Sequence, residues 1–191
     1  MTPSILILAG SLRTGSYNKR LARHTHRILK DLGYHTTLID ISDFDIPLYD
    51  QDVEDQGFPE DVTRLQKLWT QHSGYIIVSP EYNASIPGVL KNILDWMSRP
   101  NPQLAAGDSC FQGKVAGIMA TSPGRLGGLR GLRPLRELLS YLGTIVLPGE
   151  RGFPNAAEIF PSDTELDSET EQALQSLLSG WGKHLDQWSK E

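Results

Sequence analysis

Apolar residues in this chain form short continuous runs that alternate with longer stretches of helical periodicity. The run Ile5–Ala9 is rich in Leu and β-branched residues and stops abruptly at Gly10. Such a run predicts a central parallel strand that is covered on both faces. Runs of the same kind predict further strands at His35–Ile41, Tyr75–Ser79, Lys114–Ala120 and Thr144–Leu147.

Helices are predicted between these strands because apolar residues recur there every three or four positions. The first extends from about Ser16 to Leu32, where Gly33 is a typical stop signal. The stretches Ile41–Pro59 and Pro148–Asp167 are predicted to be irregular, and the carboxylates of the former are interpreted as a solvated surface. The other helices are centred on Val62–Trp69, Pro87–Met97, Leu132–Leu142 and Leu174–Trp188.

Five strand-then-helix units predict the α/β class, with a doubly wound parallel sheet and helices on both faces. A length of 191 residues suits one compact core. No repeat, low-complexity segment or linker divides the chain, so residues 1–191 are predicted to form a single domain. Ligands of such sheets bind beyond the carboxyl ends of the strands, near the point where the strand order reverses. The loops after the first, third and fourth strands are therefore the candidate ligand loops.

The loop after the first strand, Gly10–Asn18, reads Gly-Ser-Leu-Arg-Thr-Gly-Ser-Tyr-Asn and leads into a helix. Small residues allow the backbone to approach a ligand, helix-initial N–H groups favour an anion, and Arg13 offers two parallel donors to a phosphate. The spacing from Gly10 to Gly15 matches a triphosphate-binding loop, but Ser16 replaces the Lys that such a loop requires. The dinucleotide fingerprint and the nucleophilic Cys of a phosphatase are also absent. A site for a terminal monophosphate, such as that of FMN, and an ordinary polar turn with a Ser cap both remain open.

The loop after the third strand reads Pro-Glu-Tyr-Asn-Ala-Ser-Ile-Pro-Gly over residues 80–88 and continues as Val-Leu-Lys-Asn-Ile-Leu-Asp-Trp over residues 89–96. Together with the motif at residues 10–18, this segment strongly resembles the NADPH-dependent FMN reductase family, which includes quinone, azo-dye and chromate reductases. The resemblance extends from Ile5 through the fourth predicted helix. It implies a flavodoxin-like fold with five parallel strands in the order 2-1-3-4-5.

The resemblance also implies where FMN binds. The first motif is expected to hold the FMN phosphate, and the second to line the isoalloxazine ring and the ribityl chain. A third loop, residues 121–128, resembles the Gly-rich loop at the flavin edge in this family. The implied cofactor-binding residues are Ser11, Arg13, Ser16, Tyr17 and Asn18 in the first loop, Pro80, Glu81, Tyr82 and Asn83 in the second, and Ser122 in the third.

Several residues of the second motif have simpler interpretations. A surface carboxylate is the alternative for Glu81, and a cap of the following helix is the alternative for Ser85. Asn92, Asp95 and Trp96 are interpreted as structural residues that hold this helix against the sheet.

As the resemblance implies, the chain is an enzyme that passes hydride from NADPH or NADH to FMN, and then electrons to a quinone-like or other small acceptor. The flavin carries this chemistry, so no catalytic side chain is expected, and none of the five His lies on the three loops. No metal site is expected either. The alternative function is a non-enzymatic electron carrier like flavodoxin, which shares the fold and the cofactor. A homodimer or homotetramer is implied by the resemblance as well.

Composition bears on location and partners. The net charge of −5 disfavours nucleic-acid binding, which needs a basic face. Cys110 is the only Cys, so an internal disulfide is impossible and a reducing, cytoplasmic location is expected. The Cys110 side chain itself is interpreted as small and semi-buried. The run Ile5–Ala9 is far shorter than a signal-peptide core or a membrane span, so no membrane association is expected.

Overall fold

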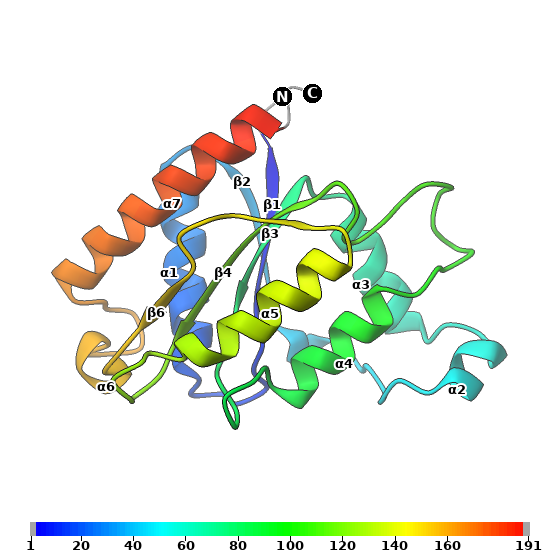
Figure 1. The fold of residues 1–191 in the computed structure, drawn as a ribbon, viewed down its shortest axis with the longest axis horizontal. Coiled ribbons are helices and arrows are strands. Elements are labelled where there is room, and N and C mark those ends of the chain that lie inside the picture. Colours follow the sequence, from blue (N-terminus) through cyan, green and yellow to red (C-terminus); the bar gives the residue numbers. More distant parts are fainter. Residues whose placement is uncertain (1–2, 189–191) are drawn as a thin grey trace.

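The computed structural model describes residues 3–188, and within them six parallel strands form one sheet (Figure 1). The strand order is β2-β1-β3-β4-β5, and β6 pairs with β4 further along that strand. This order confirms the predicted flavodoxin-like α/β fold. The strands are β1 (Ser4–Ala9), β2 (His35–Ile39), β3 (Gly74–Val78), β4 (Val115–Thr121), β5 (Ile145–Val146) and β6 (Arg151–Phe153).

Helices cover both faces of the sheet because successive strand side chains point to opposite faces. In β1, Ile5 and Ile7 belong to the core cluster on one face, whereas Leu6 and Leu8 belong to the cluster on the other. The fold is therefore a three-layer α/β/α arrangement (Figure 1). The first face is covered by α1 (Tyr17–Asp31) and α7 (Ser168–Trp188), and the second by α3 (Glu60–Thr70), α4 (Gly88–Met97) and α5 (Leu129–Tyr141).

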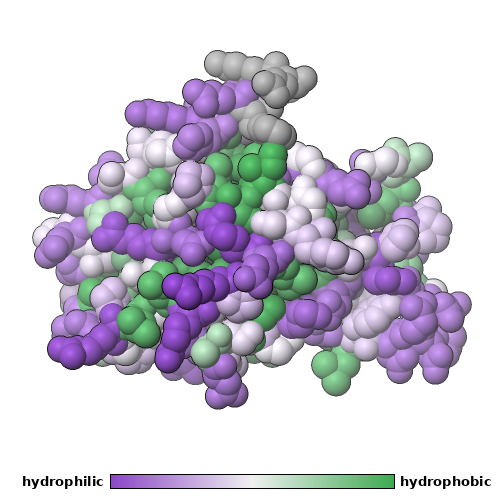
Figure 2. Space-filling view, viewed as in Figure 1, coloured by the Kyte–Doolittle hydropathy of each residue, from purple (hydrophilic) through white to green (hydrophobic). Residues whose placement is uncertain are grey.

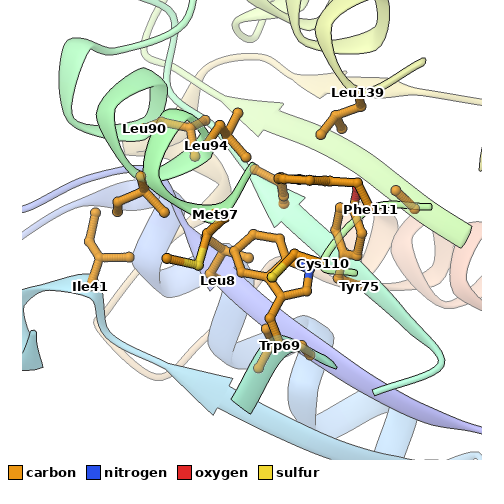
Figure 3. Packing of buried hydrophobic residues seen from close by; sticks show 14 of the residues in the cluster. Leu8, Ile41, Trp69, Tyr75, Leu90, Leu94, Met97, Cys110, Phe111 and Leu139 are labelled. Carbon is orange, nitrogen blue, oxygen red and sulfur yellow. The ribbon is translucent and has the colours of Figure 1, made fainter. Parts of the chain in front are cut away.

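Three aromatic rings form the centre of the core between the sheet and α3 (Figure 3). Trp69 of α3 packs edge-on against Tyr75 of β3 with 5.0 Å between ring centroids, and Phe111 contacts both rings. Cys110 is fully buried beside them, which corrects the expectation of a semi-buried side chain. Burial raises the pKa of its thiol to about 12. The thiol therefore stays protonated, and inert, at neutral pH.

The two segments predicted to be irregular contain short elements. β2 ends at Ile39 rather than at Ile41, because a 3-10 turn, η1 (Ile41–Asp43), follows at once. The polar helix α2 (Gln51–Gln56) comes next and has no fully buried residue. In the second segment, α6 (Ala156–Ile159) follows β6. Periodicity reveals a helix only through its apolar stripe, so a helix as polar as α2 leaves no such signal.

The carboxylates of the first segment are not all solvated, contrary to the prediction. The side chain of Glu54 is only 11% exposed and forms an ion pair with Arg99 at 2.7 Å. The hydroxyl of Tyr49 also donates to Glu54, at 2.8 Å. Glu54 therefore anchors α2 to the body of the protein.

Residues 47–49 are fastened to α4 by polar side chains. Asn92 accepts a hydrogen bond from the N–H of Tyr49 at 2.7 Å and donates to the carbonyl of Pro47 at 2.8 Å. The indole N–H of Trp96 donates to the same carbonyl at 2.8 Å. Asn92 and Trp96 are thus structural residues, but these contacts hold residues 47–49 to α4 and do not hold α4 against the sheet as predicted. Asp95 instead forms an ion pair with Lys91 of the same helix at 2.7 Å.

The predicted fifth strand, Thr144–Leu147, is shorter than expected and is continued by β6. The residues of β5 pair with the beginning of β4, and those of β6 pair with the end of the same strand. The chain leaves β4 between them at Pro148, which has no N–H, and at Gly149, whose φ is 83°. Neither residue suits a continuous ladder, so one edge strand is divided into two short ones.

Hydrophilic side chains gather over α5 and the adjoining β5–β6 segment, as the space-filling view shows (Figure 2). This distribution is typical of helices that bury one face and expose the other.

No helix in the described part of the chain is both long and apolar enough to cross a bilayer.

His72 lies just beyond α3, and both of its ring nitrogens form hydrogen bonds. Its Nδ1–H donates to the carbonyl of Leu68 at 2.8 Å, and its Nε2 accepts from the hydroxyl of Thr37 at 2.8 Å. Burial lowers the pKa of His72 from its ordinary value; the hydrogen bond to Leu68 opposes this effect, and Lys114 adds to it.

We expect this burial to make the protein less stable in mild acid. The unfolded chain protonates His72 below about pH 6.5, whereas the folded chain, with its lowered pKa, does so only at lower pH. The free energy of unfolding should therefore fall as the pH drops from about 7 toward the folded pKa. Urea unfolding of His72→Gln should show a shallower fall than the wild type, with exposed His35→Gln as the control. Equal slopes for the wild type and His72→Gln contradict the expectation.

Candidate functional site

The first loop presents a cluster of open donors at the start of α1. Ser16 is the N-cap, and its hydroxyl oxygen accepts a hydrogen bond from the N–H of Lys19 at 3.4 Å. The N–H groups of Thr14, Gly15 and Tyr17 have no acceptor among residues 3–188. N–H groups at a helix start carry the positive end of the helix dipole. This loop can therefore hold an anion.

Arg13 is the open cation of this loop. Its side chain is exposed and forms no ion pair with the described residues, and its guanidinium lies 5.8 Å from the centroid of the Tyr17 ring. Tyr17 in turn stacks on Phe160 at 5.9 Å between centroids. Ser11 is buried, and its hydroxyl oxygen accepts from the N–H of Arg13 at 3.3 Å. Ser11 thus shapes the loop, whereas Arg13 remains available to a ligand.

Asn18 joins the first loop to the end of β4. Its Nδ2 donates to the carbonyl of Thr121 at 2.9 Å, and its Oδ1 accepts from the N–H of Thr121 at 3.0 Å. The register of β3 with β4 ends at Val78 and Met119, so Thr121 has no strand partner on that side. The Asn18 amide takes the place of the missing strand. Its side chain, predicted as a cofactor ligand, is engaged with the backbone of Thr121.

The second loop lies directly beside the first. Gly10 donates its N–H to the carbonyl of Val78 at 2.9 Å. A Cβ on Gly10 would lie 3.0 Å from Cδ2 of Leu90, so the end of β1 and the start of α4 are in contact. Pro80 is buried at this junction. The first two loops therefore meet where the strand order reverses.

A tight turn forms the tip of the second loop. Tyr82 and Ser85 exchange two backbone hydrogen bonds of 2.9 and 3.0 Å, which close a turn over Asn83 and Ala84. Both turn residues are left-handed, with φ of 52° and 60°. Tyr82 is exposed beside the turn. The capping alternative for Ser85 is wrong, because α4 begins behind Pro87 and has no side-chain cap.

Glu81 connects the second loop to the third. One of its carboxylate oxygens accepts from Nε of Arg130 at 2.9 Å, and the other accepts from the N–H of Arg130 at 3.0 Å. The Glu81 side chain is only 10% exposed, so the alternative of a surface carboxylate is wrong. Arg130 was not predicted from the sequence, because 49 positions separate it from Glu81 and no local pattern marks the pair.

Ser122 lies where β4 passes into the third loop. Its N–H donates to the carbonyl of Phe153 at 3.3 Å, and its carbonyl accepts from the N–H of Ala156 at 3.0 Å. β6 and α6 therefore fix the start of this loop. α5 begins at its far end, at Leu129, one turn earlier than the apolar stripe had indicated.

Contacts between the three loops thus gather the predicted site residues at one edge of the sheet, the lower edge in Figure 1. None of the five His lies in these loops. Among residues 3–188, no three His, Cys, Asp or Glu side chains are grouped to hold a metal ion. The site offers hydrogen-bond donors, exposed apolar side chains and the exposed guanidinium groups of Arg13 and Arg125, which form no ion pair among residues 3–188.

A parallel sheet of order 2-1-3-4-5, with open N–H donors in the loop after β1, defines a flavodoxin-like fold. Residues 3–158 match the NADPH-dependent FMN reductase family. The chain belongs to this family, which confirms the resemblance seen in the two sequence motifs.

Similar proteins are oxidoreductases. The quinone reductase of Escherichia coli strain K12 is 37% identical over 186 residues, which cover 95% of this chain and 94% of that protein. An NAD(P)H-dependent FMN reductase of Pseudomonas aeruginosa is 40% identical over 138 residues, or 72% of this chain and 70% of that protein. The solved structure of FerB, a flavoenzyme NAD(P)H:(acceptor) oxidoreductase from Paracoccus denitrificans, matches with a TM-score of 0.83 at 26% identity, covering 97% and 98% of the two chains.

Family and relatives together define an enzyme, an oxidoreductase that uses FMN and NAD(P)H. They do not support the alternative of a non-enzymatic electron carrier. The flavodoxin of Pseudomonas aeruginosa has a TM-score of 0.58 at 16% identity, which shows the common fold alone.

Proposed function

We propose that this protein is an NAD(P)H-dependent quinone reductase. The three loops would hold FMN, and FMN would supply the chemistry that transfers hydride from NADPH or NADH and then electrons to a quinone-like or other small acceptor. One observation carries the proposal. Backbone N–H groups that can bind a phosphate lie near the exposed side chain of Tyr82, where the strand order reverses. The quinone reductase of Escherichia coli supports the choice of acceptor.

The phosphate of FMN is assigned to the first loop. The unpartnered N–H groups of Thr14, Gly15 and Tyr17 fit a terminal phosphate, and the unpaired guanidinium of Arg13 can balance its charge. Ser16 and Ser11 fix the shape of this loop through their own hydrogen bonds. In this arrangement Asn18 supports the site from behind, through Thr121, instead of contacting the phosphate.

The isoalloxazine ring is assigned to the second and third loops. The backbone of Pro80–Asn83 offers donors and acceptors to the polar edge of the ring, and Tyr82 offers a side chain that can pack against it. Ser122 begins the third loop, next to Thr121, and its hydroxyl has no partner among the described residues. The protein positions the ring and limits access to it, while the flavin carries the redox chemistry.

Apolar side chains on all three loops suit a planar, apolar acceptor. Leu12 in the first loop, Tyr82 in the second, Leu126 in the third and Leu129 at the start of α5 are exposed. Exposed apolar groups that converge at one site favour an apolar partner over a small hydrated ion.

Anaerobic reduction followed by turnover tests the function. The flavin-loaded protein should lose its oxidised visible absorbance when NADPH or NADH is added without air, and should recover it when a quinone is added. Steady-state rates with both nicotinamides and a panel of quinones then rank the substrates. If the flavin stays oxidised with NADPH and also with NADH, the proposal is contradicted.

Leu126→Ser should weaken the use of quinones without slowing FMN reduction. Loss of part of one leucine's apolar contact should raise KM for a quinone about five- to tenfold. The rate of FMN reduction by NADPH, measured by stopped flow, should equal that of the wild type. Tyr141→Ser is the control, because Tyr141 is 88% exposed at the far end of α5. The same KM in Leu126→Ser and wild type removes Leu126 from the acceptor site.

We also infer a homodimer or homotetramer. The α2 segment projects from the body of the protein (Figure 1), and Leu48, just before it, is 81% exposed. Residues 43–58 and 148–161 are the candidate contacts between subunits. Sedimentation velocity should show a dimer or tetramer that dissociates on dilution, with FMN affinity and activity per chain falling together. A monomer that keeps full activity over the dilution series rules this out.

Location and domain organisation are inferred in the same way. A buried, single Cys suits the reducing cytoplasm. One sheet with two core clusters extends from β1 to α7, which supports residues 1–191 acting as a single FMN-binding domain.

A further inference from the structure

The ion pair between Glu81 and Arg130 uses the full hydrogen-bonding fork of the carboxylate. Oε1 accepts from Nε of Arg130 and contacts its terminal nitrogen, both at 2.9 Å. Oε2 accepts from the N–H of Arg130 at 3.0 Å, in the first turn of α5, where the helix dipole favours a negative charge. Glu81 is thus both an ion-pair partner and a cap for α5. Its carboxylate faces α5 and not the open side of the loop.

The turn that follows Glu81 needs such an anchor. Asn83 and Ala84 both adopt left-handed backbone conformations, which residues with a Cβ rarely occupy. Tyr82, Asn83 and Ala84 are exposed, so little packing holds them from the solvent side. Two backbone hydrogen bonds close the turn from within. Its position on the protein depends on the residue at its base, Glu81.

Glycines let the start of α5 come close enough for this contact. A Cβ on Gly131 would lie 3.1 Å from the carbonyl oxygen of Ser85 and 3.3 Å from Cα of Glu81. Gly128, with φ of 85°, would place a Cβ 2.7 Å from that of Ala120. α5 therefore rests directly on the backbone of the second loop, and Arg130 lies between the two glycines.

We propose that Arg130 is a positioning residue for the flavin ring. Through Glu81 it fixes residues 80–85 in the orientation that contacts the isoalloxazine, and it does not itself touch the cofactor. The inference rests on the proposed placement of FMN over the three loops. Its consequence is specific, because residues 80–85 contact the ring and Arg13 contacts the phosphate. Loss of Arg130 weakens FMN and riboflavin equally, whereas loss of Arg13 weakens FMN alone.

Flavin titrations of apoprotein test this role. Apoproteins of the wild type, Arg130→Ala, Arg130→Lys and Arg133→Ala are titrated with FMN and with riboflavin, and binding is followed by flavin fluorescence. Arg133 lies on the same helix, is exposed and has no ion pair among the described residues, so Arg133→Ala is the matched control. Arg130→Ala should raise both dissociation constants about five- to tenfold, because the ring contacts are no longer held in place. Lys keeps the charge without the fork, so Arg130→Lys should recover part of the affinity.

Two further readouts separate positioning from general damage. The visible circular dichroism of the bound flavin should change in Arg130→Ala and not in Arg133→Ala, because it reports the asymmetric surroundings of the ring. Glu81→Gln should give the same parallel loss for FMN and riboflavin, and combining it with Arg130→Ala should add little more. If Arg130→Ala does not fold, Glu81→Gln and Arg130→Lys decide the matter by the same comparison.

Unchanged affinities in Arg130→Ala overturn the role of Arg130, and so does a loss confined to FMN, which would place Arg130 at the phosphate. A wild-type apoprotein that binds neither flavin instead overturns the proposed function, so the two failures are distinguishable.

Discussion

Arg13→Ala is expected to weaken FMN binding about ten- to a hundredfold while leaving the fold intact. Arg13 is exposed and has no counter-ion among the described residues, so its removal breaks no internal ion pair. A charge-assisted contact to a phosphate is worth about 1.5–3 kcal/mol, which corresponds to this range of affinity. The open N–H groups of the loop remain, so binding should be reduced and not abolished.

Fluorescence titration of the apoprotein with FMN measures the effect. Arg23→Ala is the control, because Arg23 is an exposed residue of α1, the helix that follows this loop, and lies beyond its first turn. Raised salt should narrow the difference between wild type and Arg13→Ala, since screening weakens an exposed charge pair. Equal FMN affinities for the two proteins would show that the phosphate lies elsewhere.

Asn18→Leu is expected to lower the free energy of unfolding of the apoprotein by about 2–6 kcal/mol. Leucine has a similar volume but can neither donate to the Thr121 carbonyl nor accept from its N–H. Asn18 is 4% exposed, so water has little access to the two backbone groups left behind. Each unsatisfied buried group costs about 1–3 kcal/mol, and two are created.

Urea unfolding of the apoproteins gives this measurement, with Arg13→Ala as the comparison from the same loop. The two variants should behave in opposite ways. Arg13→Ala should keep the stability of the apoprotein and lose FMN affinity, whereas Asn18→Leu should lose stability before any flavin is added. An Asn18→Leu apoprotein as stable as the wild type would mean that the Thr121 backbone finds other partners.

The central strands were predictable because they are buried on both faces. In β1 and β3 almost every residue is buried, so each strand appears in the sequence as a continuous apolar run. The edge lacks that signal. β6 consists of Arg-Gly-Phe and pairs on one side only, so it has no apolar pattern to recognise. The strand order was available only from the family resemblance, since periodicity does not specify which strands are neighbours.

For the candidate site, the loops were predictable, whereas the division of labour within them was not. Gly, Ser and Arg before a helix indicate an anion site through local chemistry alone. The roles of Asn18 and Glu81 depend on Thr121 and Arg130, which lie 103 and 49 positions away along the chain. A single sequence records neither contact. Polar residues of a binding motif can therefore serve the backbone around the ligand as well as the ligand.

The divided edge strand, β5 and β6, also bears on whether the sheets of two molecules can join. A long, flat edge invites another chain to add to the sheet and begin aggregation. Here the edge consists of the two residues of β5, a kink at Pro148 and the three residues of β6. The guanidinium of Arg136 covers the kink by donating to the carbonyls of Val146 and Leu147 at 3.0 and 2.7 Å. An incoming strand meets a charged side chain where it would need free carbonyls, so this edge is a poor template for fibril growth.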